Sequence, residues 1–112
     1  MTIVALPDDR LEACPLLTRA FELLGKRWNA LILDVLSTRP ARFSEIHRAV
    51  PRLSDRVLGE RLHELVEAGL LGRKEDAGAT LYSLTGTGAR LKPGLDELRA
   101  WAQTLPPRPA GP

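Results

Sequence analysis

The stretch RFSEIHRAVPRLSDRVLGERLHELVEAGLLGRK, residues 42–74, decides the fold. It contains two helical patterns that are interrupted at Pro51. A proline disfavours the helical conformation of the residue before it, so the first helix, with Ser44 as its N-cap, is predicted to end at Val50 after about two turns. Two helices this close together are typical of a helix-turn-helix.

The second helix of this stretch, predicted over residues 54–68, is the most regular element of the chain. Ser54 is a favourable N-cap, and Gly69 ends the pattern. One side of the helix carries a line of leucines, namely Leu58, Leu62 and Leu65. At about 100° per residue, the opposite side carries Arg56, Glu60, His63 and Glu67. This polar side is therefore predicted to be exposed.

Two further helices are predicted before this stretch. In the first, Cys14 is the N-cap, Pro15 is the first helical residue and Gly25 is the stop. Its apolar stripe consists of Leu17, Ala20, Phe21 and Leu24. The second helix ends before Pro40, and its broad stripe predicts the centre of the core. That stripe consists of Trp28, Leu31, Ile32, Val35 and Leu36.

After the long helix, the hydrophobic pattern changes to a period of two. Residues 71–75 and 80–84 are predicted strands, joined by a turn at 76–78 into a two-stranded hairpin. Thr85 is predicted to cap a final helical region that kinks near Pro93. Its stripe consists of Leu91, Leu95, Leu98, Ala102 and Leu105. The predicted fold is therefore mostly α with a small β-hairpin.

The length and composition of the chain fit one globular domain, since it has 112 residues, of which 44% are hydrophobic and 27% charged. We assign the domain to residues 13–104, with an N-terminal tail over 1–12 and a proline-rich C-terminal tail over 105–112. No apolar run approaches the roughly 20 residues of a membrane span, and no signal peptide is evident. We therefore expect a cytoplasmic protein without a membrane partner, and the single cysteine fits a reducing compartment.

The positive charge is concentrated in one segment. Residues 39–63 hold six arginines and three acidic residues, which gives this segment a net charge of +3. The net charge of the whole chain is +2. Residues 1–38 carry −1, and residues 64–112 carry 0. A basic segment that coincides with two helices indicates a nucleic-acid partner, although charge alone also fits an ordinary solvated surface.

The motifs of enzymes and metal sites are not evident. His47 and His63 lie 16 residues apart without cysteines beside them, which is not a zinc pattern. The GTG at residues 86–88 is too short for a nucleotide fingerprint, and no nucleophile elbow or carboxylate pair is evident. We therefore predict no enzyme, no metal and no cofactor.

The order of these elements predicts a winged helix-turn-helix, and several motifs resemble one family in particular. CPLLTRAFELLGKRWNALIL at 14–33, residues 42–71 of the opening stretch, and YSLT followed by LRAWA at 98–102 closely resemble the HxlR-type bacterial transcriptional regulators, which are related to the MarR group. The resemblance covers about residues 13–103.

The resemblance implies a homodimer that binds double-stranded DNA, with helix 54–68 of each copy in the major groove of a pseudo-palindromic operator. The first and last helices would form the dimer, and in the last helix the interface residues would be Leu91, Leu95, Leu98 and Trp101. The hairpin loop, KEDAGAT at 74–80, is shorter than the usual wing of this family, which leaves its contact with the minor groove open.

On the DNA-facing helix, we predict that Ser54, Arg56, Val57 and Glu60 read base edges. Arg56 is the candidate for a bidentate contact with guanine O6 and N7, and Glu60 either accepts from cytosine N4 or holds Arg56 through an (i, i+4) pair. Phosphate contacts, which set affinity and orientation, are predicted for Arg42, Ser44, Arg48, Arg52, His63, Arg73 and Lys74. The alternative is a protein-interaction module whose basic face binds an acidic partner.

Cys14 is the candidate sensor of an effector. A thiolate at a helix N-cap is stabilised by the helix dipole and reacts more readily with oxidants and electrophiles. Some relatives in this family sense such compounds through a cysteine at this kind of position, so an oxidant or small-molecule effector is a hypothesis here. The alternative is a small capping residue without a switch role, because no second cysteine is present to resolve a sulfenate within the chain.

Overall fold

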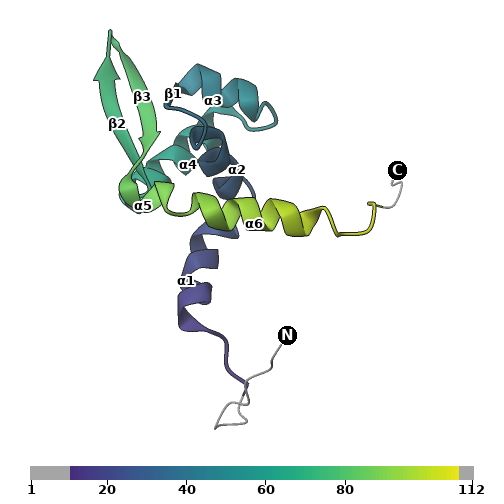
Figure 1. Cartoon of the computed structure of the whole chain (residues 1–112). Coiled ribbons are helices and arrows are strands. Elements are labelled where there is room, and N and C mark those ends of the chain that lie inside the picture. Colours follow the sequence, from purple (N-terminus) through teal and green to yellow (C-terminus); the bar gives the residue numbers. More distant parts are fainter. Residues whose placement is uncertain (1–10, 109–112) are drawn as a thin grey trace.

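The computed structural model describes residues 11–108 (Figure 1). Of the tails predicted over 1–12 and 105–112, residues 1–10 and 109–112 lie outside the described residues. Its elements in chain order are α1 (Pro15–Leu24), α2 (Asn29–Leu36), β1 (Ala41–Arg42), α3 (Phe43–Ala49), α4 (Asp55–Glu67), β2 (Leu71–Asp76), β3 (Ala79–Leu84), α5 (Gly86–Ala89) and α6 (Lys92–Ala102). The α3–turn–α4 unit followed by the β2–β3 hairpin confirms the predicted winged helix-turn-helix. Of the helices in residues 11–108, none combines the length and apolar composition of a transmembrane span.

The core is formed mainly by α2 and α4, and α3, β1, β2 and α6 each add one buried apolar residue. Ile32 of α2 and the predicted leucine line of α4 are fully buried, which confirms the direction in which α4 faces. Each fully buried side chain of this size stabilises the fold by about 1.5–3 kcal/mol. That line consists of Leu58, Leu62 and Leu65, each 0% exposed.

The buried side of α2 differs from the predicted stripe. Leu31 is 47% exposed, whereas Leu33 is 1% exposed. The buried residues are Asn29, Ile32, Leu33 and Leu36, which also follow the i, i+3, i+4, i+7 spacing. Ile32 and Leu36 are buried as predicted, but the predicted stripe is displaced at its other positions, because the buried line begins at a polar residue, which a pattern of apolar positions cannot include.

The short helix α3 begins earlier than predicted. Its N-cap is Arg42, so Ser44 lies inside the first turn and is exposed. Glu45 takes over the capping role, because its Oε1 accepts a hydrogen bond from the backbone N–H of Arg42 at 3.0 Å. The predicted end is confirmed, since Val50 before Pro51 has left the helical conformation with φ −129° and ψ 65°.

Both ends of α4 are as predicted. The Oγ of Ser54 accepts a hydrogen bond from the backbone N–H of Val57 at 3.2 Å, which makes Ser54 the N-cap. Gly69 has φ +82°, and the N–H of Leu70 donates to the carbonyl oxygen of Leu65 at 3.0 Å. This is a Schellman motif, which requires the left-handed conformation that glycine adopts readily.

The predicted hairpin of β2 and β3 is confirmed, and β1 adds a third strand that was not predicted, in the order β1-β3-β2. β2 and β3 pair in antiparallel register from Leu71 opposite Leu84 to Asp76 opposite Ala79, and their turn has positive φ at Ala77 and Gly78. The additional strand, β1, pairs with β3 but has only two residues. Such a strand is too short to show any periodicity in the sequence.

The final helical region is divided into two helices instead of being kinked at Pro93. Thr85 caps α5 as predicted, since its Oγ1 accepts from the N–H of Gly88 at 3.1 Å. The chain then turns near Arg90, and Pro93 lies in the first turn of α6, where its missing N–H has no partner to lose. In Figure 1 the hairpin and α1 extend from opposite ends of the domain, and α6 projects to the side.

Candidate nucleic-acid interface

The exposed face of α4 carries the predicted base-reading residues. The side chain of Arg56 is 77% exposed and that of Glu60 is 50% exposed, because both lie opposite the buried leucines. Ser54 is also exposed, at the start of the helix. Val57 is half-buried and packs against the core, so only part of its side chain is accessible. The N-terminal half of α4 therefore presents a polar surface that no other described element covers.

Arg56 and Glu60 form an ion pair along this face, with 2.6 Å between Nη1 and Oε1. An exposed (i, i+4) pair contributes only about 0.3–0.5 kcal/mol to stability. A guanidinium has five N–H donors in a planar fork, so the pair leaves donors for a guanine edge while it restrains the side chain. Further along the helix, the side chain of His63 is 65% exposed, and its Nε2 lies 3.9 Å from Oε1 of Glu67.

His47 stabilises the turn between α3 and α4, a role that the sequence did not indicate. His47 lies in the last turn of α3, and its Nε2 donates a hydrogen bond to the carbonyl oxygen of Leu53 at 2.8 Å. Its Nδ1 lies 3.6 Å from the carboxylate of Asp55 in the first turn of α4. His47 therefore connects the two helices of the motif. The only signal in the sequence is a polar residue close to Pro51.

The predicted phosphate-contacting residues are exposed or half-buried. Arg42 is tied to the tip of the wing, because its Nη2 lies 3.5 Å from the carboxylate of Asp76. Arg73 and Lys74 are neighbours in β2 and point to opposite faces of the hairpin, so one face presents only one of them. The exposed members of the set are Ser44, Arg48, Arg52, His63, Arg73 and Lys74.

An ion pair joins the residues before α3 to the first turn of this helix. Arg39 donates to Glu45 at 2.7 Å. This bond, together with the N–H of Arg42, lowers the pKa of Glu45 to about 2. The same pair raises the pKa of Arg39. The guanidinium of Arg39 is therefore engaged with Glu45, and its charge still contributes to the net charge of the basic segment.

The residues predicted for the dimer interface do not share one environment. Leu95 is 8% exposed and belongs to the core of its own chain, where α6 packs against α2, and Leu91 is half-buried. Leu98 and Trp101 are 44% and 59% exposed. On α1, no residue is buried, and the predicted apolar stripe is exposed or half-buried. The large exposed apolar residues of α1 are Leu16, Leu17 and Phe21.

Cys14 is exposed at the start of α1. Its carbonyl oxygen accepts hydrogen bonds from the backbone N–H and the Oγ1 of Thr18, at 2.9 and 3.0 Å, while its side chain caps no backbone group. Among residues 11–108, no group of three or more metal-ligating side chains is present.

Comparison with known proteins finds close relatives. Residues 23–108 match the HxlR-like helix-turn-helix family. The chain is 42% identical over 92 residues to the HTH-type transcriptional regulator YodB of Bacillus subtilis (strain 168), covering 80% of this chain and 82% of YodB. It is 46% identical over 97 residues to YvaP of the same strain, an uncharacterized HTH-type transcriptional regulator, covering 84% of this chain and 90% of YvaP. The crystal structure of quinone-bound YodB from B. subtilis superposes with a TM-score of 0.75 at 41% identity, covering 83% of this chain and all of that one.

Proposed function

The chain belongs to the HxlR-like helix-turn-helix family of transcriptional regulators, and we propose that it binds a pseudo-palindromic operator as a homodimer, with α4 of each copy in the major groove. Like its relatives, it is a regulator and not an enzyme. Because the target is DNA, the cytoplasmic location expected from the sequence is part of the same proposal.

The observation that carries the proposal is the two-sided character of α4. Its leucine line anchors the helix in the core, while Arg56 and Glu60 on the other side are free of the rest of the described chain. The major groove, about 12 Å wide, accommodates one helix, and residues near the N-terminal end of that helix reach the base edges. Arg56 is the second residue of α4, which supports it as the residue that would make a bidentate contact with guanine.

The flanking cations support binding without setting the sequence preference. Arg48 and Arg52 lie on the α3 side of the motif, and Arg73 and Lys74 lie in the wing. Contacts of these residues with phosphates would fix the register of the protein on the duplex and make its affinity depend steeply on salt.

The homodimer is supported by the exposed apolar residues of α1 and α6. Soluble proteins rarely leave large apolar side chains of neighbouring elements uncovered, and most homo-oligomers are symmetric dimers. Two copies that meet through Phe21 on α1 and Trp101 on α6 would bury these side chains. Two α4 helices would then contact half-sites about one turn apart, at about 10 bp or an integral multiple.

We also propose that Cys14 responds to oxidants or electrophiles. Its exposure leaves it open to reagents in solution, and it begins a helix that would take part in the dimer. The relative YodB has been solved with a quinone bound. A modified Cys14 would stand close to the dimer interface, where a small change in geometry alters the distance between the two α4 helices.

The experiment that tests this function is the selection of bound duplexes from a random pool with the purified chain. The proposal predicts an enriched inverted repeat with half-sites about 10 bp apart, or an integral multiple, and an affinity that falls steeply with salt. A pool without an enriched sequence, with only weak and sequence-blind binding, would instead support the protein-interaction module.

A further inference from the structure

α1 is attached to the domain mainly through its C-terminal end. None of its ten residues is buried, and it projects from the domain in Figure 1. Leu23 and Leu24, in its last turn, are the residues of α1 that pack against the core. These few apolar contacts at one end leave the rest of α1 without packing against the core. The directional bonds at this junction therefore add a restraint on the angle between α1 and α4.

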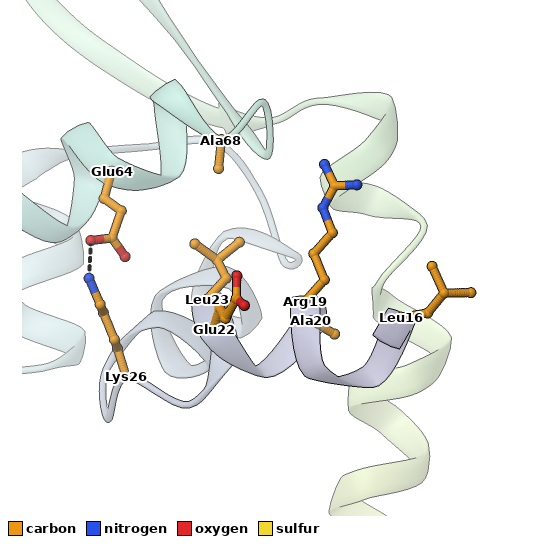
Figure 2. A pocket seen from close by; sticks show the side chains of 8 residues that line it. All are labelled: Leu16, Arg19, Ala20, Glu22, Leu23, Lys26, Glu64 and Ala68. Carbon is orange, nitrogen blue, oxygen red and sulfur yellow. Dashed lines mark hydrogen bonds and ion pairs between the residues drawn. The ribbon is translucent and has the colours of Figure 1, made fainter. Parts of the chain in front are cut away.

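Those bonds converge on one carboxylate, that of Glu64 on α4. Its Oε2 accepts from Nζ of Lys26 at 2.5 Å and from Nη1 of Arg61 at 3.2 Å, and its Oε1 accepts from Nδ2 of Asn29 at 2.9 Å. The same Nδ2 donates to the carbonyl oxygen of Leu23 at 2.8 Å, in the last turn of α1. Figure 2 shows Lys26 and Glu64 pointing toward one another across the pocket between α1 and α4.

The network includes a buried polar side chain that is only partly satisfied. Asn29 is 0% exposed, and its Oδ1 has no hydrogen-bond partner within residues 11–108. An unsatisfied buried polar atom opposes folding, so the amide is not explained by stability alone. Buried polar groups of this kind can specify one packing geometry among several. The contacts with Lys26 and then Asn29 also lower the pKa of Glu64, which keeps its carboxylate charged.

We propose that Glu64 is a positioning residue for operator recognition, which holds α4 at a fixed angle to α1 through Lys26 and Asn29. This inference rests on the proposed function, because the angle matters only if α1 contributes to a dimer and α4 enters DNA. In that dimer, the network defines how far apart the two α4 helices lie. Glu64 itself does not contact DNA, since it faces the junction and not the exposed side of α4.

α1 is long enough for a small tilt at the junction to change the distance between the two α4 helices of the dimer. A helix of ten residues is about 15 Å long, so a tilt of about 13° at one end displaces the other end by about 3.4 Å. This displacement equals the rise of one base pair. A junction that lost its directional bonds would therefore tolerate half-site spacings that the intact junction rejects.

The test is a comparison of affinities for the selected operator and for duplexes whose half-sites are moved by one base pair in either direction. Glu64→Gln keeps the size of the side chain and one acceptor for Asn29 but loses the charge. Lys26→Met removes the ammonium from a half-exposed side chain that does not belong to the buried core. Glu22→Gln is the matched control, because Glu22 lines the same pocket and makes no ion pair with another described residue.

Both network variants are expected to reduce the preference for the natural spacing at least fivefold, with sequence-blind binding unchanged. Glu22→Gln should keep the preference of the wild type. The inference is wrong if both network variants keep the wild-type preference, or if all duplexes weaken by the same factor, as for a merely structural role. If Glu64→Gln does not fold, the spacing preference of Lys26→Met alone tests the inference. A wild-type chain without any preferred duplex would overturn the proposed function itself, which is a different result.

Discussion

Replacing Arg56 with alanine should separate DNA recognition from stability. The side chain of Arg56 is 77% exposed, and its ion pair with Glu60 lies on the surface. Exposed pairs contribute about 0.3–0.5 kcal/mol, so the free energy of unfolding should change by less than about 1 kcal/mol. The variant is therefore expected to fold and dimerise like the wild type.

The loss of DNA affinity should be much larger. A bidentate contact between arginine and guanine contributes about 1–3 kcal/mol, which corresponds to roughly 5- to 150-fold in affinity for each half-site. If the two half-sites act independently, the dimer loses about 2–6 kcal/mol. Glu60 should add to this loss, because without Arg56 its unpaired carboxylate would be repelled by the phosphates. The double variant with Glu60→Ala isolates that contribution in a double-mutant cycle.

The assay is equilibrium binding to the selected operator and to duplexes with each of the other base pairs at the contacted position. The wild type should prefer one base pair, and Arg56→Ala should lose that preference. Arg90→Ala, which removes an exposed arginine outside α3 and α4, is the matched control. It should change neither the affinity for the operator nor the preference for one base pair. The assignment fails if Arg56→Ala retains the preference, or if it weakens every duplex equally, as a phosphate contact would.

Three further predictions concern the neighbouring groups. Arg52→Ala should weaken binding to all duplexes alike and reduce the salt slope by about 1 for each copy, and a loss confined to one base pair would contradict the phosphate assignment. Cys14→Ser should bind the operator normally but lose its response to diamide or quinones, and equal responses of both proteins would end the sensor hypothesis. The pKa of Glu45 is lowered to about 2 by Arg39, so this carboxylate favours the folded state above its ordinary pKa of 4.5 and loses that effect as the pH falls through about 2. Glu45→Gln should flatten the pH dependence of the unfolding midpoint between pH 4.5 and about 2, and an unchanged dependence measured by circular dichroism would refute the role of this ion pair.

The parts of the fold that the sequence predicted well are those with local causes. The N-cap at Ser54, the leucine line of α4 and the stop at Gly69 all lie within one helix, where spacing alone determines which side is buried. The same spacing predicted that Arg56 is exposed. Local pattern also predicted the hairpin, whose turn at Ala77 and Gly78 has positive φ.

The parts that the sequence did not predict depend on residues far apart in the chain. β1 exists because Ala41 pairs with Tyr82, and Glu64 meets Lys26 across 38 positions. Asn29 is buried because Glu64 and the carbonyl oxygen of Leu23 accept from its amide. An apolar stripe also predicts a face without saying what covers it, and in α1 Leu17 and Phe21 of that stripe are exposed.

The most direct test of recognition by α4 is methylation interference on the selected operator, because dimethyl sulfate modifies guanine N7 in the major groove and adenine N3 in the minor groove. The account predicts two clusters of interfering guanines about 10 bp apart, or an integral multiple, and the loss of one guanine from each cluster with Arg56→Ala. A single cluster, or interference confined to adenines, would contradict the insertion of two α4 helices into the major groove.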